Sequence, residues 1–208
     1  SGATALRTVG PVALPQSVAD ALAFVAPTTQ MPAAPSRPIQ QRVPTAAATA
    51  DNDDGFNTPS VLKKLYGVGA AAGSSSTNRQ AVTGFLGQRF SASDLSEFYS
   101  LYDRASKGRK ITTRGDDGGS ALFGGVEAML DAEYVSSMAH NVSTEFWGFT
   151  GRAPGSHGEN EPFLEWLLLL SNTSDADAPK VISTSYGEDE DSVEPAYAER
   201  LNIEFAKA

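Results

Sequence analysis

The stretch VEAMLDAEYVSSM, Val126–Met138, is closely followed by NVSTEFWGF, Asn141–Phe149. The first segment predicts a helix, and the second, rich in β-branched and aromatic residues, predicts a strand. The helix carries two carboxylates four residues apart, Glu127 and Asp131. At about 100° per residue these acids lie about 40° apart around the helix axis, so they share one face.

Helical and strand patterns alternate outward from this stretch. Helices are predicted from Pro59 to about residue 67 and over 91–105, 161–172 and 192–208; a strand followed by a turn is predicted over 80–90, and a further strand over 180–187. Ser91 or Ser93 would cap the second helix, and a Gly-rich loop, 114–125, precedes Val126. Because alternating elements of this kind form crossover connections, we expect an α/β fold with a largely parallel sheet and helices on both faces.

Residues 1–54 differ from the rest of the chain. They contain a short helix pattern for which Ser17 is the expected N-cap, followed by a Pro-, Ala- and Thr-rich run. That run has no apolar periodicity, so residues from about 27 to 54 should lack regular structure. We place the start of a compact domain, 55–208, just before Thr58, which would cap a helix beginning at Pro59.

The bulk composition excludes several classes of function. The net charge of −9 argues against a nucleic-acid partner, because phosphate binding needs clustered Lys and Arg. No apolar run reaches the ~18 residues of a membrane span. Cysteine is absent, and the two histidines, His140 and His157, lack metal-ligand spacing, so we expect no metal site within this chain.

The acid pair has two interpretations. Leu130, Tyr134, Val135 and Met138 flank Glu127 and Asp131, while the opposite arc carries Ala132, Glu133 and Ser136. On that apolar arc, burial and mutual repulsion should raise at least one pKa of the pair, so that the two carboxyls share a proton. Such a pair suits general acid–base catalysis at acidic pH. The alternative is a solvated helix face with chance spacing.

Several segments together resemble the sedolisins, the serine-carboxyl peptidases, and among them the tripeptidyl-peptidases. They are TPSVLKKLYGV, QAVTGFLGQRFSASDLSEFY, VEAMLDAEYVSSMA after a Gly-rich loop, NVSTEFWGF, NEPFLEWLLLLSN and VISTSYGEDEDSVEPAYAERLN, in that order. The resemblance covers about 55–208 and implies a subtilisin-like fold, incomplete in this chain. It also implies a Ser-Glu-Asp triad with Glu127 as general base oriented by Asp131, and substrate contacts from Ser185, Tyr186 and Gly187.

The resemblance leaves part of the active site outside this chain. The Gly-Thr-Ser motif of the family's nucleophile and the Ser-Gly-Asp motif of its oxyanion aspartate do not occur here, and its calcium site would also lie in the absent C-terminal part. We therefore expect the N-terminal portion of an acid peptidase that releases tripeptides from free N-termini or cuts internally. The alternative is a catalytically inactive structural or binding subunit.

The cellular setting follows from the same resemblance. Residues 1–54 would be the end of a prosegment and its activation linker, as in a zymogen. Asn141 and Asn172 begin N-glycosylation tripeptides at the ends of predicted elements, which suits a secretory protein. A lysosomal or other acidic vesicular compartment, or secretion, is expected. The partners would be a peptide or protein substrate and the C-terminal part of the peptidase domain.

Overall fold

The computed structural model describes residues 13–22, 56–117, 119–154, 160–187 and 189–208. The described residues form two compact units, one over 56–150 and 173–185, the other over the remainder. The predicted linker, 27–54, the domain boundary at 55 and His157 lie outside the described residues.

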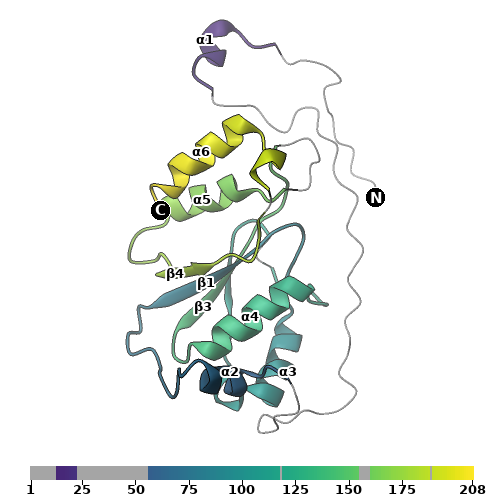
Figure 1. Cartoon of the computed structure of the whole chain (residues 1–208), viewed down its shortest axis with the longest axis vertical. Helices are drawn as coiled ribbons and strands as arrows, with labels where there is room; N and C mark the ends of the chain where they lie inside the picture. Colours follow the sequence, from purple (N-terminus) through teal and green to yellow (C-terminus); the bar gives the residue numbers. More distant parts are fainter. Residues whose placement is uncertain (1–12, 23–55, 118, 155–159, 188) are drawn as a thin grey trace. The chain divides into compact units, whose positions relative to one another are not determined.

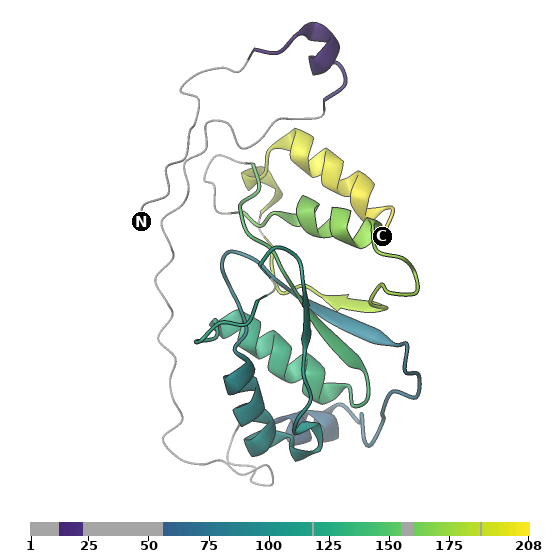
Figure 2. The same ribbon diagram turned by 180° about the vertical axis from the view of Figure 1, so that it is seen from behind.

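The first unit contains a four-stranded sheet. The strands are β1 (Arg79–Gly84), β2 (Thr112–Arg114), β3 (Ser143–Gly148) and β4 (Val181–Ser183), in the order β2-β3-β1-β4. All three pairings are parallel, and β1 and β3 run side by side along their whole length (Figure 2). The sheet with its helices confirms the predicted α/β class.

Strand β2 is a correction to the sequence prediction. Arg114 was assigned to the Gly-rich loop, but it is the last residue of β2 and is paired with Trp147 of β3. A three-residue strand is too short to show alternation, so the hydrophobic pattern did not indicate it. The loop therefore begins at Gly115, whose φ of 84° favours glycine.

Helices α2 (Pro59–Leu65), α3 (Ala92–Tyr102) and α4 (Val126–Met138), with the 3-10 helix η1 (Arg104–Ser106), complete this unit (Figure 1). The capping predictions are confirmed: the side chain of Thr58 accepts a hydrogen bond from the Val61 amide, and that of Ser91 from the Asp94 amide. Each cap satisfies an amide that the first helical turn leaves without a partner.

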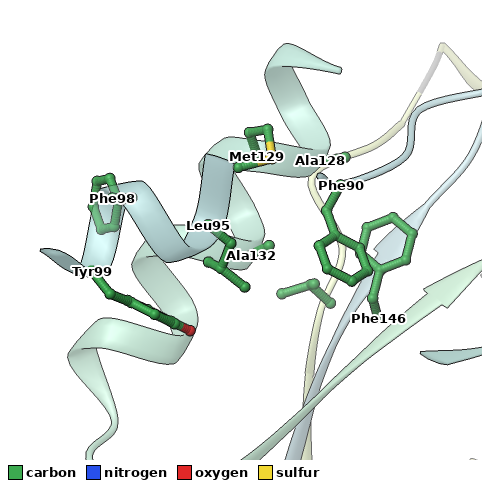
Figure 3. Close-up of a cluster of buried hydrophobic side chains, with 9 residues drawn as sticks. Phe90, Leu95, Phe98, Tyr99, Ala128, Met129, Ala132 and Phe146 are labelled. Atoms are coloured by element: carbon green, nitrogen blue, oxygen red, sulfur yellow. The ribbon is translucent and has the colours of Figure 1, made fainter. Parts of the chain in front are cut away.

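The core of this unit lies where α3 and α4 meet the sheet. Figure 3 shows side chains of α3 and α4 facing the rings of Phe90 and Phe146, whose centroids are 5.2 Å apart. The buried cluster consists of Val82, Phe90, Leu95, Phe98, Tyr99, Ala128, Met129, Ala132 and Phe146. It fixes α4 against β1 and β3, and so positions the acid pair.

The second unit holds α1 (Gln16–Ala19), α5 (Phe163–Ser171), the 3-10 helix η2 (Glu190–Ser192) and α6 (Pro195–Phe205). Helices α5 and α6 pack together: the Tyr197 hydroxyl accepts from the Leu164 amide at 3.0 Å, and Trp166 meets Phe205 edge-on. The N-cap predicted for α1 was wrong. Pro15 occupies that position, because its fixed φ suits an extended residue before the first turn.

Candidate active site

Helix α4 is held on several sides by hydrogen bonds. The Gln80 amide of β1 donates to the Val135 carbonyl and to the Thr144 hydroxyl, both at 3.0 Å, which ties the helix to two strands. The Tyr99 hydroxyl of α3 donates to Ser136 at 2.6 Å. Because its partners come from β1, β3 and α3, the helix gives its side chains fixed positions.

The loop before α4 is also attached to its surroundings. The Ala121 amide donates to the Phe90 carbonyl at 2.9 Å, and the Gly125 amide donates to the Arg89 carbonyl at 2.8 Å. Gly125 is the N-cap of α4, and a Cβ on its neighbour Gly124 would clash with the Met129 side chain. The two glycines thus allow the close approach that sets where α4 begins.

The buried side of α4 is not the one that the sequence predicted. Leu130, expected beside the acids on the buried arc, is 49% exposed, whereas Ala132 and Ser136 of the opposite arc are buried. Small side chains at 128, 132 and 136 let the helix approach α3 and the sheet closely. This four-residue spacing of small residues was a signal in the sequence that would have indicated the buried face.

Asp131 is nonetheless buried, with 7% of its surface exposed. Its Oδ1 accepts a hydrogen bond from the Ser185 hydroxyl at 2.8 Å. Its Oδ2 is buried and has no hydrogen-bond partner among the described residues. Burial raises the pKa of Asp131; the hydrogen bond from Ser185 lowers it and the charge of Glu127 raises it. The expectation of at least one raised pKa in the pair is confirmed.

Glu127 lies in the first turn of α4, where the helix dipole favours a carboxylate. It is half-buried, and its charge acts on Asp131. The structure therefore combines a buried acid that favours its protonated form with a more accessible acid at the helix N-terminus.

A third acid of the same helix, Glu133, is a further correction. The sequence placed it on the polar arc, but it is half-buried, and burial raises its pKa to about 8, with a smaller contribution from the Asp94 charge on α3. The position of α3 buries this side chain, and the period of the helix alone does not reveal it.

Of the three predicted substrate contacts, Ser185 reaches the acid pair through its bond to Asp131. Tyr186 and Gly187 belong to the second compact unit, so their predicted contact with substrate stays a prediction. The Ser185–Asp131 bond joins residues 54 positions apart, and no local sequence pattern indicates it.

A second buried acid, Glu145 of β3, has a different environment. It is 3% exposed, and its carboxylate faces Arg79 at 3.4 Å and Arg114 at 3.0 Å. The Trp147 indole donates to it at 2.7 Å, and the Arg114 guanidinium lies 5.6 Å from the centre of that indole ring. With two cations and one donor, this carboxylate is compensated within the sheet.

The metal-ligating residue types and the predicted glycan acceptors have the following environments. The described residues contain no group of three or more His, Asp or Glu side chains that could hold a metal ion. His140 instead contacts Lys63 at 2.5 Å and lies 3.8 Å from Asp103. Asn141 and Asn172 are both exposed, as glycan acceptors must be.

Comparison with known proteins places the chain among peptidases. It is 41% identical to tripeptidyl-peptidase 1 of Mus musculus over 210 residues, 41% to that of Canis lupus familiaris over 211, and 38% to that of Homo sapiens over 211. Each alignment covers 98% of this chain. The chain belongs to the sedolisin family. No protein-family model matches it.

The 208 residues span 35% of the length of these relatives. The sedolisins are the serine-carboxyl peptidases. Among the described residues, no helix is long and apolar enough to cross a membrane.

Proposed function

We propose that this chain is the N-terminal part of an acid serine-carboxyl peptidase that releases tripeptides from free N-termini or cuts internally. Glu127 is the general base, and Asp131 orients it. The nucleophilic serine and the oxyanion aspartate lie on a segment outside these 208 residues. The substrate is a peptide or protein, and Tyr186 and Gly187 contact its backbone.

One observation carries this proposal: Asp131 is a buried carboxylate on the same helix as Glu127, and no cation among the described residues is paired with it. Burying an acid beside another acid is unfavourable for folding. Such an arrangement is typical of sites where a shifted pKa serves chemistry. The sedolisin family supplies the reaction class in which a Glu–Asp pair has this role.

The mechanism follows from the two environments. Glu127, half-buried at the start of α4, takes the proton of the serine hydroxyl as its oxygen attacks the peptide carbonyl. It then returns that proton to the leaving amine. Asp131 keeps a proton at acidic pH and shares it with Glu127, which holds the base in place. As the pH rises and both groups ionise, the shared proton is lost and turnover falls.

The setting proposed for the protein is that of a zymogen. Residues 1–54 are the end of the prosegment and its linker, 55–208 begin the peptidase domain, and Asn141 and Asn172 carry N-linked glycans. An acidic compartment such as the lysosome, or secretion, suits the pH dependence. Resemblance to the family supports a calcium site in the C-terminal part of the protein, outside these 208 residues.

The test uses the full-length, processed protein and an N-terminally unblocked tripeptide reporter between about pH 3 and 8. Glu127→Gln should lower kcat by about 10²–10⁴-fold, because an amide cannot accept the serine's proton. Asp131→Asn should also lower kcat strongly, but by less than Glu127→Gln does. Glu133→Gln, the same change on the same helix, is the matched control and should keep its turnover at acidic pH.

Two results would overturn the proposal. A Glu127→Gln variant as active as wild type would remove the catalytic role of the pair. Inactivity of the folded, processed wild type over the whole pH range would favour a catalytically inactive sedolisin-like structural or binding subunit. A protein of that kind would also lack the Gly-Thr-Ser and Ser-Gly-Asp motifs beyond residue 208.

A further inference from the structure

The bond between Ser185 and Asp131 joins the end of a strand to the middle of a helix. Ser185 lies two residues beyond β4, which pairs with β1. The residue before it, Thr184, accepts a hydrogen bond from the Thr83 hydroxyl of β1 at 3.1 Å. The sheet therefore fixes the backbone that presents the Ser185 hydroxyl to Asp131.

The bond occupies one side of the carboxyl group. The Ser185 hydroxyl donates to Oδ1 at 2.8 Å, while Oδ2 is buried without a partner among the described residues. A carboxyl group held by one oxygen keeps its second oxygen in a defined direction. The Ser185 bond thus leaves Oδ2 as the oxygen of Asp131 that has no hydrogen bond in the described part of the chain.

We propose that Ser185 is a positioning residue: its hydroxyl orients the Asp131 carboxyl so that Oδ2 is directed to the proton shared with Glu127. The inference rests on the proposed function and gives Ser185 a role other than the substrate contact expected from the sequence. Ser185 acts through Asp131 and does not touch the reacting atoms.

The electrostatics around Asp131 make this role measurable. The hydroxyl donates to the ionised form of Asp131 and so opposes burial and the Glu127 charge, both of which favour the protonated form. Other charged groups of the described residues act at different positions on or near α4. Asp94 acts on Glu133, and Arg109 donates to the Ser136 carbonyl at 2.8 Å. Lys63 contacts His140, and Arg79 faces Glu145. The effect of removing the hydroxyl should therefore appear in the titration of the acid pair.

The experiment compares Ser185→Ala with Ser185→Thr in the full-length, processed protein. Loss of the hydroxyl raises the proton affinity of Asp131, so the basic limb of the pH profile of kcat/KM should move to higher pH by about 1 unit, the equivalent of one hydrogen bond to a charged group. Ser185→Thr retains a donor and should restore the wild-type profile. Ser183→Ala, an exposed serine of β4, is the matched control.

The outcomes separate this inference from the proposed function. An unshifted profile for Ser185→Ala, with Glu127→Gln inactive, would overturn the positioning role alone. A higher KM with an unshifted profile would overturn it in favour of substrate contact. Activity in Glu127→Gln would instead overturn the proposed function. Should Ser185→Ala not fold, Ser185→Cys makes the same comparison, since a thiol is a weak donor and a smaller shift in the same direction is expected.

Discussion

Two buried carboxylates of the sheet-containing unit lie in opposite environments. Glu145, in the centre of the sheet, faces the guanidinium groups of Arg79 and Arg114 and accepts from the Trp147 indole. Asp131, on α4, accepts a hydrogen bond from the Ser185 hydroxyl, and the charged group that acts on it is another acid, Glu127. Both are almost fully buried.

The difference separates two uses of a buried acid. A buried charge is tolerable when cations and donors compensate it, and Glu145 has both. Asp131 has no cation paired with it in the part of the chain that the structure describes, so its burial favours the protonated form and is unfavourable to folding at neutral pH. We infer that Glu145 serves the fold and that Asp131 serves the site, where stability is commonly given up for activity.

Glu145→Gln should give the largest change in stability. The amide would leave Arg79 and Arg114 without their shared counter-charge, and removing one partner of a buried ion pair costs about 3 kcal/mol. Urea unfolding of the full-length protein measures the loss. Glu97→Gln, an exposed acid on α3, is the control and should stay within about 0.5 kcal/mol of wild type. A change in unfolding free energy for Glu145→Gln as small as that of the control would contradict the inference that Glu145 serves the fold.

Glu133→Gln should give the next largest change in the free energy of unfolding, and only at higher pH. The folded state keeps the proton of Glu133 up to about pH 8, while the unfolded chain releases it near 4.5. Wild-type stability therefore falls as the pH rises through this window, and the glutamine variant escapes that loss. The full shift corresponds to about 5 kcal/mol between the two ends of the window, and the partial exposure of the side chain reduces the gain of the variant relative to wild type. Unfolding curves at both pH values test this, and a constant difference would contradict it.

His140→Gln should change the free energy of unfolding by less than Glu133→Gln does, and its effect should appear as the pH falls instead of as it rises. Burial and the Lys63 charge lower the pKa of His140, against the opposing pull of Asp103. Below about pH 6.5 the unfolded chain takes up a proton that the folded protein resists, so wild-type stability falls with falling pH. The variant should lack this dependence of stability on pH. Unfolding curves between about pH 5 and 7.5 measure it, and an unchanged slope would exclude His140 as its source.

The sequence predicted what depends on local pattern. The alternation of segments such as 126–138 and 141–149 indicated the α/β class, and the caps at Thr58 and Ser91 were visible as side chains that satisfy free amides. Glu127 and Asp131 were found from their spacing on a helix.

The rest depends on contacts between distant segments. The buried face of α4 is set by small residues that pack on α3 and the sheet. The apolar residues around Leu130 indicated a different face, and that prediction was wrong. Strand β2 is defined by pairing with β3, since three residues carry no periodicity. The hydroxyl of Ser185 reaches Asp131 only because β4 pairs with β1.

The most direct test of the difference between the two acids is the Asp131→Asn variant of the full-length protein, with unfolding free energy and turnover measured on the same preparation. The account predicts stability at neutral pH that is equal to or above that of wild type, because the amide carries no charge to bury, together with a loss of turnover of at least about 10²-fold. A variant that loses about 3 kcal/mol of stability and keeps its turnover would contradict the account, because Asp131 would then serve the fold as Glu145 does.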